Sequence, residues 1–423
     1  MNVGNAVFVD AVNGNDSTGL RGRSDLPFLT LAAAKTAALS GDTITVRPGS
    51  YSGTNLLKDG VNWYFYPGGT VTQTSGSGIF DDTSSGANGS VTSVIGGSGR
   101  FISNAYVIKS NAPASNITLN ADFIGGSGQF LVKHSGTGTI TINANQLYST
   151  ACPAIWWLYG SGDMVVNAHV IQGVKTAIYC SGTASGGGQL YVRSDLIKET
   201  SASLSSEFGA ISISGTNQLD SRIWVYASQI ESVNNAAVHV KSNKLYVTAQ
   251  KIFGPITNDG GELWVMNAKL SPLAGQSSIG INLTAGTSHI TSNQIEDSTT
   301  STADLIHVSG GTHYVGGLAA TRVNNGNGVS VSGGYLTLTG LSIKTLASYS
   351  DLVQTGGVLT VLGCSYDTAK ISGTITQGDP RVARAAQLGS GTSLPTDGSV
   401  YQLFVTSGHF YGWNGSLWKE LDN

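Results

Sequence analysis

A short pattern that recurs along most of this chain constrains its fold more than any other feature. Its clearest copy covers residues 139–147, where apolar and polar residues alternate before a small residue, a glutamine and another apolar residue. Further copies begin at Leu190, Ile223, Leu245, Ile290, Leu336 and Leu359. Successive copies lie roughly 19 to 26 residues apart, with one interval of about 33, which is the period range of a solenoid.

A second apolar motif follows in many of the repeats. It reads small, apolar, any residue, apolar, and a Ser-Gly or Gly-Gly turn usually comes after it. Clear copies begin at Ala154, Ala177, Ala210, Ala237, Gly280 and Gly328. Two strands of this kind and a shorter third in each repeat predict one rung of an all-β, three-sheet parallel β-helix.

The composition excludes several classes of partner. The chain has 57 glycines, only 11% charged residues and a net charge of −3. Because it lacks a basic field, we expect it to bind neither nucleic acid nor an anionic membrane surface, and bulk electrostatics would not attract polyanionic glycans. No apolar stretch approaches the length of a membrane span, so no membrane insertion is expected.

The cysteines and the N-terminus indicate where the protein folds. Cys152, Cys180 and Cys364 are odd in number and lack the spacing of metal ligands, so we expect free, buried thiols and a reducing cytoplasm. Residues 1–5 contain no basic segment followed by an apolar run, so no signal peptide is expected. Neither a metal ion nor another cofactor is expected.

The N-terminal region carries the one convincing helix of the sequence. Residues 29–39 are rich in alanine, which favours helix, and Thr30 or Ser24 is a candidate N-cap. Gly41-Asp42 is expected to end the helix. Residues 43–51 then read as a strand that runs into a turn.

Five short motifs of this region also occur in a recognisable order. They are Val9-Asp10, Asn13-Gly14-Asn15-Asp16, Ala32-Ala33-Ala34, Gly41-Asp42-Thr43-Ile44 and Val46-Arg47-Pro48-Gly49-Ser50-Tyr51. Together they resemble the start of the pectate-lyase-like right-handed parallel β-helix proteins. In that superfamily a helix caps the open end of the first coil, where apolar side chains and unpaired strand amides would otherwise be exposed. The resemblance implies the same helical cap here.

The repeat pattern stops after Gly378. Residues 379–423 are expected to form a linker and a small β module, with Asn414-Gly415 as a hairpin turn. The pattern Tyr-x-Trp-Asn-Gly-x-x-Trp at residues 411–418 is similar to short terminal modules of bacteriophage fibre and appendage proteins. We therefore expect a cap and first coil over residues 1–60, a parallel β-helix over 61–378, and a C-terminal module over 379–423.

Alternation within the strands predicts which side chains face outward. If Leu190 and Val192 point inward, Tyr191 points outward, and the equivalent residues of later repeats stack beside it. The resulting aromatic strip consists of Tyr191, Trp224, Tyr246 and Trp264, with Tyr226 beside it and Tyr314 further along. A second outward column consists of Trp156, Tyr179, Ser212 and His239, the last expected as a surface histidine. Two interpretations stay open: a platform on which sugar rings stack, or a subunit interface.

Carboxylates suited to glycan cleavage gather around the longest insertion, residues 199–220, which is expected to leave the coil as a lateral loop. The candidate catalytic residues are Asp195, Glu199, Glu207, Asp220 and Glu231. Hydrolysis would need paired carboxylates about 5–10 Å apart, and β-elimination would need calcium-binding carboxylates with a basic residue. No lyase motif is visible. The alternative interpretation is that these carboxylates are ordinary charged residues of a loop, with no catalytic role.

Other polar groups suggest mainly structural roles. His169 and Asp195 are expected to be neighbours one rung apart, either as a surface hydrogen bond or as a base and the group that orients it. The pair Asp81-Asp82 reads as a solvated turn. An outward ladder of amides, hydrogen-bonded from rung to rung, is predicted for Asn120, Asn143 and Asn167.

The two resemblances together imply a function. β-helix appendages of bacteriophages are typically homotrimers that bind, or bind and cleave, bacterial surface glycans. We therefore expect a virion protein, a tailspike, tail fibre or head fibre, that is assembled in the host cytoplasm. Its expected partners are other virion proteins and bacterial surface polysaccharide. A glycan depolymerase and a purely structural virion decoration stay open as alternatives.

Overall fold

The structure, a computed structural model of the 423-residue chain, describes most of the sequence. The described residues are 5–74, 76–82, 90–112, 114–158, 162–182, 187–201, 209–215, 221–271, 280–297, 303–322, 326–346 and 348–378, and the backbone of short strands beyond residue 388. Their strands form one long stack and a separate small sheet.

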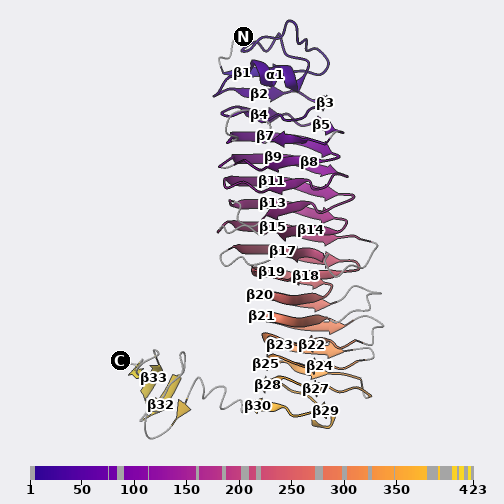
Figure 1. The fold of residues 1–423 in the computed structure, drawn as a ribbon, viewed down its shortest axis with the longest axis vertical. Helices are drawn as coiled ribbons and strands as arrows, with labels where there is room; N and C mark the ends of the chain where they lie inside the picture. Colours follow the sequence, from indigo (N-terminus) through magenta and orange to yellow (C-terminus); the bar gives the residue numbers. More distant parts are fainter. Residues whose placement is uncertain are drawn as a thin grey trace.

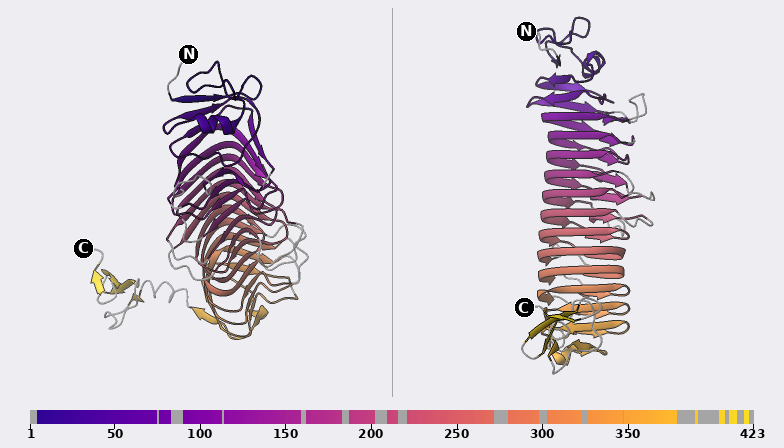
Figure 2. Two further views of the ribbon diagram at one scale, coloured as in Figure 1. Left: turned by 45° about the horizontal axis from the view of Figure 1, so that its top comes forward. Right: turned by 90° about the vertical axis from the view of Figure 1, so that its left-hand side faces the viewer.

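The long stack is a parallel β-solenoid of the right-handed type. Coil follows coil along the long axis from the N-terminal end (Figure 1), and the strands run across that axis in the side view (Figure 2). The strand pairings fall into three columns, so each coil has three faces. The parallel β-helix expected from the repeats is therefore confirmed.

The three faces are built from strands in consecutive order. The first face contains β1 (Ala6–Val9), β2 (Thr43–Val46), β4 (Asn62–Phe65), β7 (Thr92–Ser103), β9 (Asn116–Gly126), β11 (Thr139–Ser149), β13 (Met164–Gly173), β15 (Gln189–Glu199), β17 (Arg222–Ser232), β19 (Lys244–Phe253), β20 (Ile256–Ser271), β21 (Ile281–Asp297), β23 (Thr312–Arg322), β25 (Tyr335–Thr339), β28 (Val358–Leu362) and β30 (Thr376–Gly378). The second face contains β3 (Gly49–Ser52), β5 (Gly69–Gln73), the C-terminal parts of those first-face strands that lie between β7 and β23, and β26 (Ser342–Lys344). The third face contains β6 (Gly78–Asp81), β8 (Tyr106–Ser110), β10 (Val132–His134), β12 (Ile155–Leu158), β14 (Thr176–Ser181), β16 (Gly209–Ile213), β18 (Ala236–Val240), the N-terminal parts of β20 and β21, β22 (Ile306–Val308), β24 (Val329–Val331), β27 (Leu352–Gln354) and β29 (Ile371–Ser372).

The register places equivalent residues of the repeats directly above one another. Leu190 of β15 pairs with Ile223 of β17, which pairs with Leu245 of β19, and all three are fully buried. The apolar cluster they belong to is continuous from Val7 to Val361. Inward side chains pack against those of the same coil and of the coils above and below it, so the stability of each coil depends on its neighbours.

The N-terminal helix is shorter than the sequence suggests and does not act as the expected cap. Helix α1 (Leu31–Ala37) begins at the N-cap Thr30, whose hydroxyl accepts a hydrogen bond from the amide of Ala33, and it buries Leu31 and Ala34. The free edge of β1 is instead bonded by the loop that follows this strand and leads to α1. Gly22 and Phe28 donate their amides to the carbonyls of Ala6 and Phe8 at 2.7 and 2.8 Å, and Asp10 donates to Phe28. A helical cap is therefore not supported, because a loop satisfies this strand edge.

The C-terminal residues contribute a second, smaller sheet. It contains β31 (Gly389–Ser390), β32 (Leu403–Thr406), β33 (His409–Trp413) and β34 (Trp418–Glu420), with β33 antiparallel to β32 and β34. The predicted Asn414-Gly415 turn lies outside the described residues. The domain boundaries at residues 60 and 378 stay predictions, and strand pairing continues without interruption from β1 to β30.

Candidate functional site: a groove along the first face

A ladder of aromatic rings follows the outer surface of the first face. Neighbouring rings lie 3.8–6.3 Å apart between centroids, and their planes are within 19° of parallel. The members of this aromatic ladder are Tyr191, Trp224, Tyr246, Trp264, His289 and Tyr314. The predicted aromatic strip is thus a continuous stack of rings. His289 fills the gap that the sequence analysis left between Trp264 and Tyr314.

The stacking changes what the ladder offers to a ligand. Trp224 lies 4.6 Å from Tyr191 on one side and 5.6 Å from Tyr246 on the other, with interplanar angles of 2° and 17°. An interior ring therefore has both faces against other rings and presents only its edge to solvent. Sugars stack on ring faces, so the interior of the ladder is not the stacking platform that the sequence suggested.

Polar groups along the edge of the ladder hold several rings in place. The Trp264 indole N–H donates to Glu262 at 2.9 Å, and Lys244 pairs with the same carboxylate at 3.1 Å. Partial burial raises the pKa of Glu262, but the bonds from Trp264 and Lys244 outweigh it and lower that pKa overall. Burial between its ring neighbours lowers the pKa of His289, although Glu262 opposes the shift.

An amide ladder lies on the same face, in the next outward row and closer to the N-terminus. The side chain of Asn143 donates to Asn120 at 2.8 Å, and that of Asn167 donates to Asn143 at 2.9 Å. This confirms the predicted asparagine ladder. The same row continues in the following coils with Arg193 and Tyr226.

Two hollows along this face join into one groove. The first, of about 800 Å³, passes the amide ladder, and its lining includes His169, Arg193 and Asp195. The second, of about 450 Å³, passes the aromatic ladder from Trp224 to Tyr314. Tyr226 and Thr248 line both hollows, so the two adjoin there. We call the combined surface the first-face groove.

The groove contains a histidine–carboxylate pair and a guanidinium group. His169 Nδ1 lies 2.6 Å from Asp195 Oδ2, and both side chains are about two-thirds exposed, at 71% and 68%. The Arg193 guanidinium lies 5.9 Å from the centroid of Tyr226, and within the described residues it forms no ion pair. The groove therefore offers donors, acceptors and one aromatic face along a single line.

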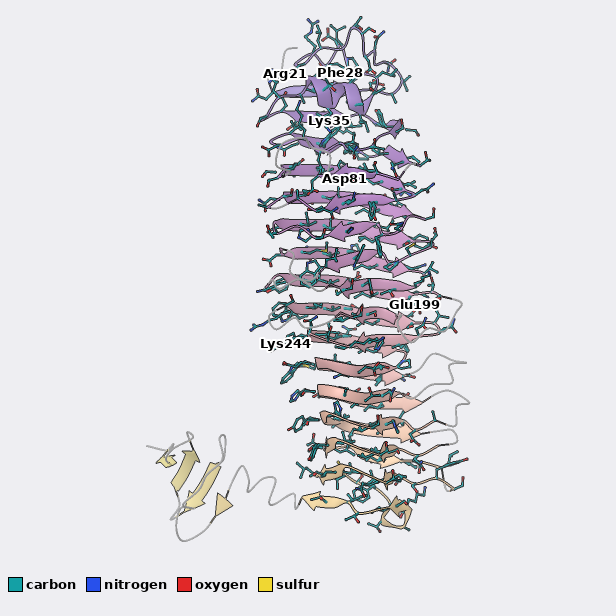
Figure 3. All side chains as sticks on the ribbon, in the orientation of Figure 1. Arg21, Phe28, Lys35, Asp81, Glu199 and Lys244 are labelled. Carbon is teal, nitrogen blue, oxygen red and sulfur yellow. The ribbon has the colours of Figure 1, made fainter. Side chains whose placement is uncertain are left out.

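The remaining acidic candidates lie in other surroundings. Glu199 is fully buried and accepts hydrogen bonds from the Ser201 amide, from Ser232 at 2.7 Å and from Asn235 at 3.3 Å. Burial raises the pKa of this carboxyl, and those hydrogen bonds oppose the shift. Figure 3 shows Glu199 on the opposite side of the stack from Lys244, which borders the aromatic ladder.

Glu231 lies on the second face, where it pairs with Lys198 at 2.9 Å. Glu207 and Asp220 lie outside the described residues. Of the described candidates, the structure places Asp195 on the first-face groove and brings neither Glu199 nor Glu231 to it. Residues 199–220 also contain strand β16, which pairs with β14 and β18, so the expected lateral loop is interrupted by a regular part of the third face.

The second aromatic column lies on the third face in the expected register. Trp156 donates to Ser181 at 2.8 Å and lies under the Lys133 ammonium, and its ring is tilted by 36° against that of Phe130 at a centroid distance of 4.3 Å. Tyr179 accepts a hydrogen bond from Ser214. His239 continues the column but is only 2% exposed, with Nε2 at 2.8 Å from Asp259. The expectation of a surface histidine was therefore wrong, because its polar end is bonded to a carboxylate and enclosed.

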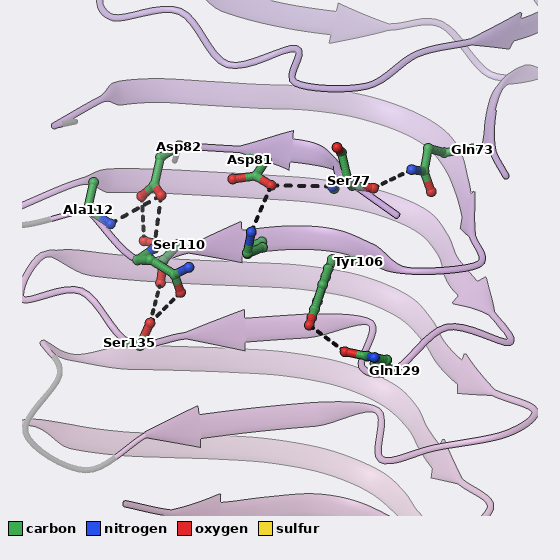
Figure 4. Close-up of polar contacts among 12 residues, drawn as sticks. Gln73, Ser77, Asp81, Asp82, Tyr106, Ser110, Ala112, Gln129 and Ser135 are labelled. Carbon is green, nitrogen blue, oxygen red and sulfur yellow. Dashed lines mark hydrogen bonds and ion pairs between the residues drawn. The ribbon is translucent and has the colours of Figure 1, made fainter. Parts of the chain in front are cut away.

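Asp81 and Asp82 are also buried, contrary to the sequence interpretation. The Asp82 carboxylate accepts bonds from the Ser110 hydroxyl and from the amides of Asn111 and Ala112 at 2.9–3.1 Å (Figure 4). Asp81 faces Lys109 at 3.4 Å. Both carboxylates therefore contact residues of the next coil, so the pair has a structural explanation.

A scan against protein-family models and searches of curated proteins and solved structures find no match for this chain. Among the described residues, no group of three or more histidines, cysteines or carboxylates is arranged to hold a metal ion. No helix in the described part of the chain has the length and apolar character that crossing a membrane requires.

Proposed function

We propose that this protein is an adhesin that binds an extended polysaccharide along the first-face groove. The observation that carries the proposal is that two hollows of the same face adjoin at Tyr226 and Thr248. An open groove that runs across many coils suits a linear polymer better than a small molecule, which proteins usually enclose. The net charge of −3 and the mixed polar and aromatic lining agree with a carbohydrate rather than a nucleic acid.

The residues of the groove have complementary chemistry for a carbohydrate. Asn120, Asn143 and Asn167 offer amide groups at the regular rung spacing of about 4.8 Å, and these can donate to and accept from sugar hydroxyls. Tyr226 is 44% exposed, and its row continues with the short Thr248, so one face of its ring has no aromatic neighbour. That face can contact the apolar face of a sugar ring.

We place this adhesin in a virion, as a tailspike, tail fibre or head fibre that assembles as a homotrimer. The support is the resemblance of the N-terminal motifs to pectate-lyase-like β-helix proteins and of residues 411–418 to terminal modules of phage appendages. Measurement of the mass of the full chain in solution tests the trimer. A monomer would contradict this part of the proposal.

A second candidate function is glycan cleavage. It is favoured by the position of His169 and Asp195 in the groove, where a carboxylate at 2.6 Å orients an imidazole toward bound polymer. Release of oligosaccharides from a bound polysaccharide, lost in His169→Gln, would establish the enzyme. Binding without release would leave the adhesin.

The proposed function is tested with an array of purified bacterial capsular polysaccharides and lipopolysaccharides. The full chain is expected to bind some of them, and Tyr226→Ala is expected to weaken that binding about tenfold through loss of the ring contact. Tyr148→Ala is the matched control, because Tyr148 is an exposed tyrosine on the second face. An absence of binding to the whole array, or equal loss in both variants, would contradict the proposal.

A further inference from the structure

The aromatic ladder ends at Tyr314, next to a much shorter side chain in the following coil. In the coil after Tyr314 the equivalent residue is Thr337, and in the coil after that it is Thr360. A tyrosine side chain reaches much further from the backbone than a threonine, while the coils are separated by only about 4.8 Å. The outer part of the Tyr314 ring therefore projects beyond Thr337. One of its faces lies against His289, and the other has no ring against it.

The surroundings of this free face suit a polar ring. Tyr314, Gly316, Thr291 and Thr339 line the hollow of about 450 Å³. Gly316 lies in the next outward row of the same strand, and the hydroxyl of its partner Thr339 lies in the space that a side chain at Gly316 would take, so the threonines provide hydroxyl groups beside Tyr314. The Tyr314 ring is 44% exposed, and its hydroxyl makes no hydrogen bond within the described residues.

The other end of the ladder lacks these properties. The neighbour of Tyr191 in the preceding coil is Val165, which is apolar. The Tyr191 hydroxyl is already bonded to Gln189. Neither Tyr191 nor Val165 lines one of the two hollows. The two ends are therefore not equivalent, and the Tyr314 end is the one open to a ligand.

We propose that the free face of Tyr314 is a sugar-stacking subsite that binds one pyranose ring of the polysaccharide, while the interior rings of the aromatic ladder stabilise the solenoid. The inference rests on the proposed function and adds the position at which the polymer contacts an aromatic face. The C–H groups on one face of a pyranose meet the electron-rich ring face, and the sugar hydroxyls reach Thr339 and the Tyr314 hydroxyl.

Two variants test the subsite in opposite ways. Tyr314→Ala removes the ring and is expected to weaken polysaccharide binding about tenfold. Thr337→Tyr places a new ring against the free face, inside the hollow that ends at Thr339 of the same strand. This variant is expected to raise the melting temperature, because it extends the ladder, and to weaken binding by a similar factor. Loss of fold cannot produce that combination.

The probe is an array polysaccharide that binds the unmodified full chain, and the control is Tyr335→Ala. Tyr335 is an exposed tyrosine two residues before Thr337 on the same face, and it lines neither hollow. Normal binding by Tyr335→Ala with weakened binding by the two test variants supports the subsite. If Tyr226→Ala weakens binding but Tyr314→Ala and Thr337→Tyr do not, the subsite is refuted and the groove stands. If no array polysaccharide binds the unmodified chain, both proposals fail.

Discussion

The first face carries two ladders, in which the outward side chains of successive coils contact one another in different ways. In strands β9 to β13 one outward row of this face holds asparagines, each bonded to the next through a side-chain amide. From β15 to β23 the adjacent outward row holds aromatic rings stacked face to face. Both ladders use the repeating register to place like groups beside like groups.

The difference between the ladders lies in what remains available to a ligand. An amide that donates to one neighbour and accepts from another still has a second N–H and further lone pairs, so the amide ladder keeps polar capacity along its length. A ring stacked on both faces keeps only its edge. The amide ladder therefore keeps hydrogen-bonding groups at every coil, whereas the aromatic ladder keeps a free ring face only where it ends.

The largest effect that we predict is a loss of stability at low pH, and it involves two buried histidines, His134 on the third face and His313 on the first face. Burial lowers the pKa of His134 from 6.5 to about 4 and also lowers that of His313. Above pH 6.5 both folded and unfolded chains hold His134 neutral. As the pH falls toward 4, only the unfolded chain takes up this proton, so His134 removes about 3 kcal/mol of stability.

His134→Gln is expected to remove that part of the pH dependence, because glutamine does not titrate. Its amide can still donate to the Gly138 carbonyl that His134 contacts at 3.2 Å, so the fold is kept. The measurement is urea unfolding between pH 7 and pH 4, with His313→Gln alongside. An unchanged slope in His134→Gln would show that the histidine does not titrate as inferred.

The next effect is expected in the interior of the aromatic ladder. Trp224→Ala removes the contacts to Tyr191 and Tyr246 and is predicted to destabilise the fold by about 1–3 kcal/mol, from two ring pairs. Thermal unfolding followed by circular dichroism measures the loss. Tyr64→Ala serves as the control, because Tyr64 is an exposed tyrosine of the first face outside the ladder. Similar melting temperatures for the two variants would count against a structural role of the stack.

A smaller effect is expected in the amide ladder. Asn143→Ala breaks two hydrogen bonds at 2.8 and 2.9 Å, each of which contributes about 1 kcal/mol, so we predict a loss of about 1–2 kcal/mol. Because Asn143 also lines the groove, binding of array polysaccharide is expected to weaken too. Trp224→Ala should affect stability more than binding, and Asn143→Ala should affect both. Chemical denaturation and the polysaccharide array measure the two quantities, and the reverse pattern would overturn the comparison.

The smallest effect on stability is predicted for the exposed pair in the groove. His169→Ala removes a contact to Asp195 between two well-exposed side chains, and such pairs contribute about 0–1 kcal/mol. A change in melting temperature within error is the expected result of differential scanning calorimetry. A large loss would indicate that the pair supports the corner of the coil and is not free to serve a ligand.

The sequence predicted what depends on repetition. The register of Tyr191, Trp224 and Tyr246, the asparagine ladder and the contact of His169 with Asp195 all follow from strand period and coil length. His289 was not predicted as a member, because the predicted strip contained only tyrosine and tryptophan. Its spacing from Trp264 and Tyr314 nevertheless fits the column, and imidazole is also a planar ring.

Features that depend on side-chain direction or on irregular segments of the chain could not be predicted from the repeat period. The orientation of the rings is set by side-chain torsions, which residue spacing does not determine. The burial of Asp82 and His239 depends on turns and partners from other coils, such as Ala112 and Asp259. The edge of β1 is bonded by a loop whose sequence has no strand pattern.

The central claim is that the first face holds a linear polymer in its groove. The most direct measurement is a structure of the full chain, by crystallography or electron cryomicroscopy, with an oligosaccharide prepared from a polysaccharide that it binds. We predict density for the sugar chain along the first face, between the amide ladder and Tyr314, in contact with Tyr226. Density on the second or third face, with an empty groove, would contradict the claim.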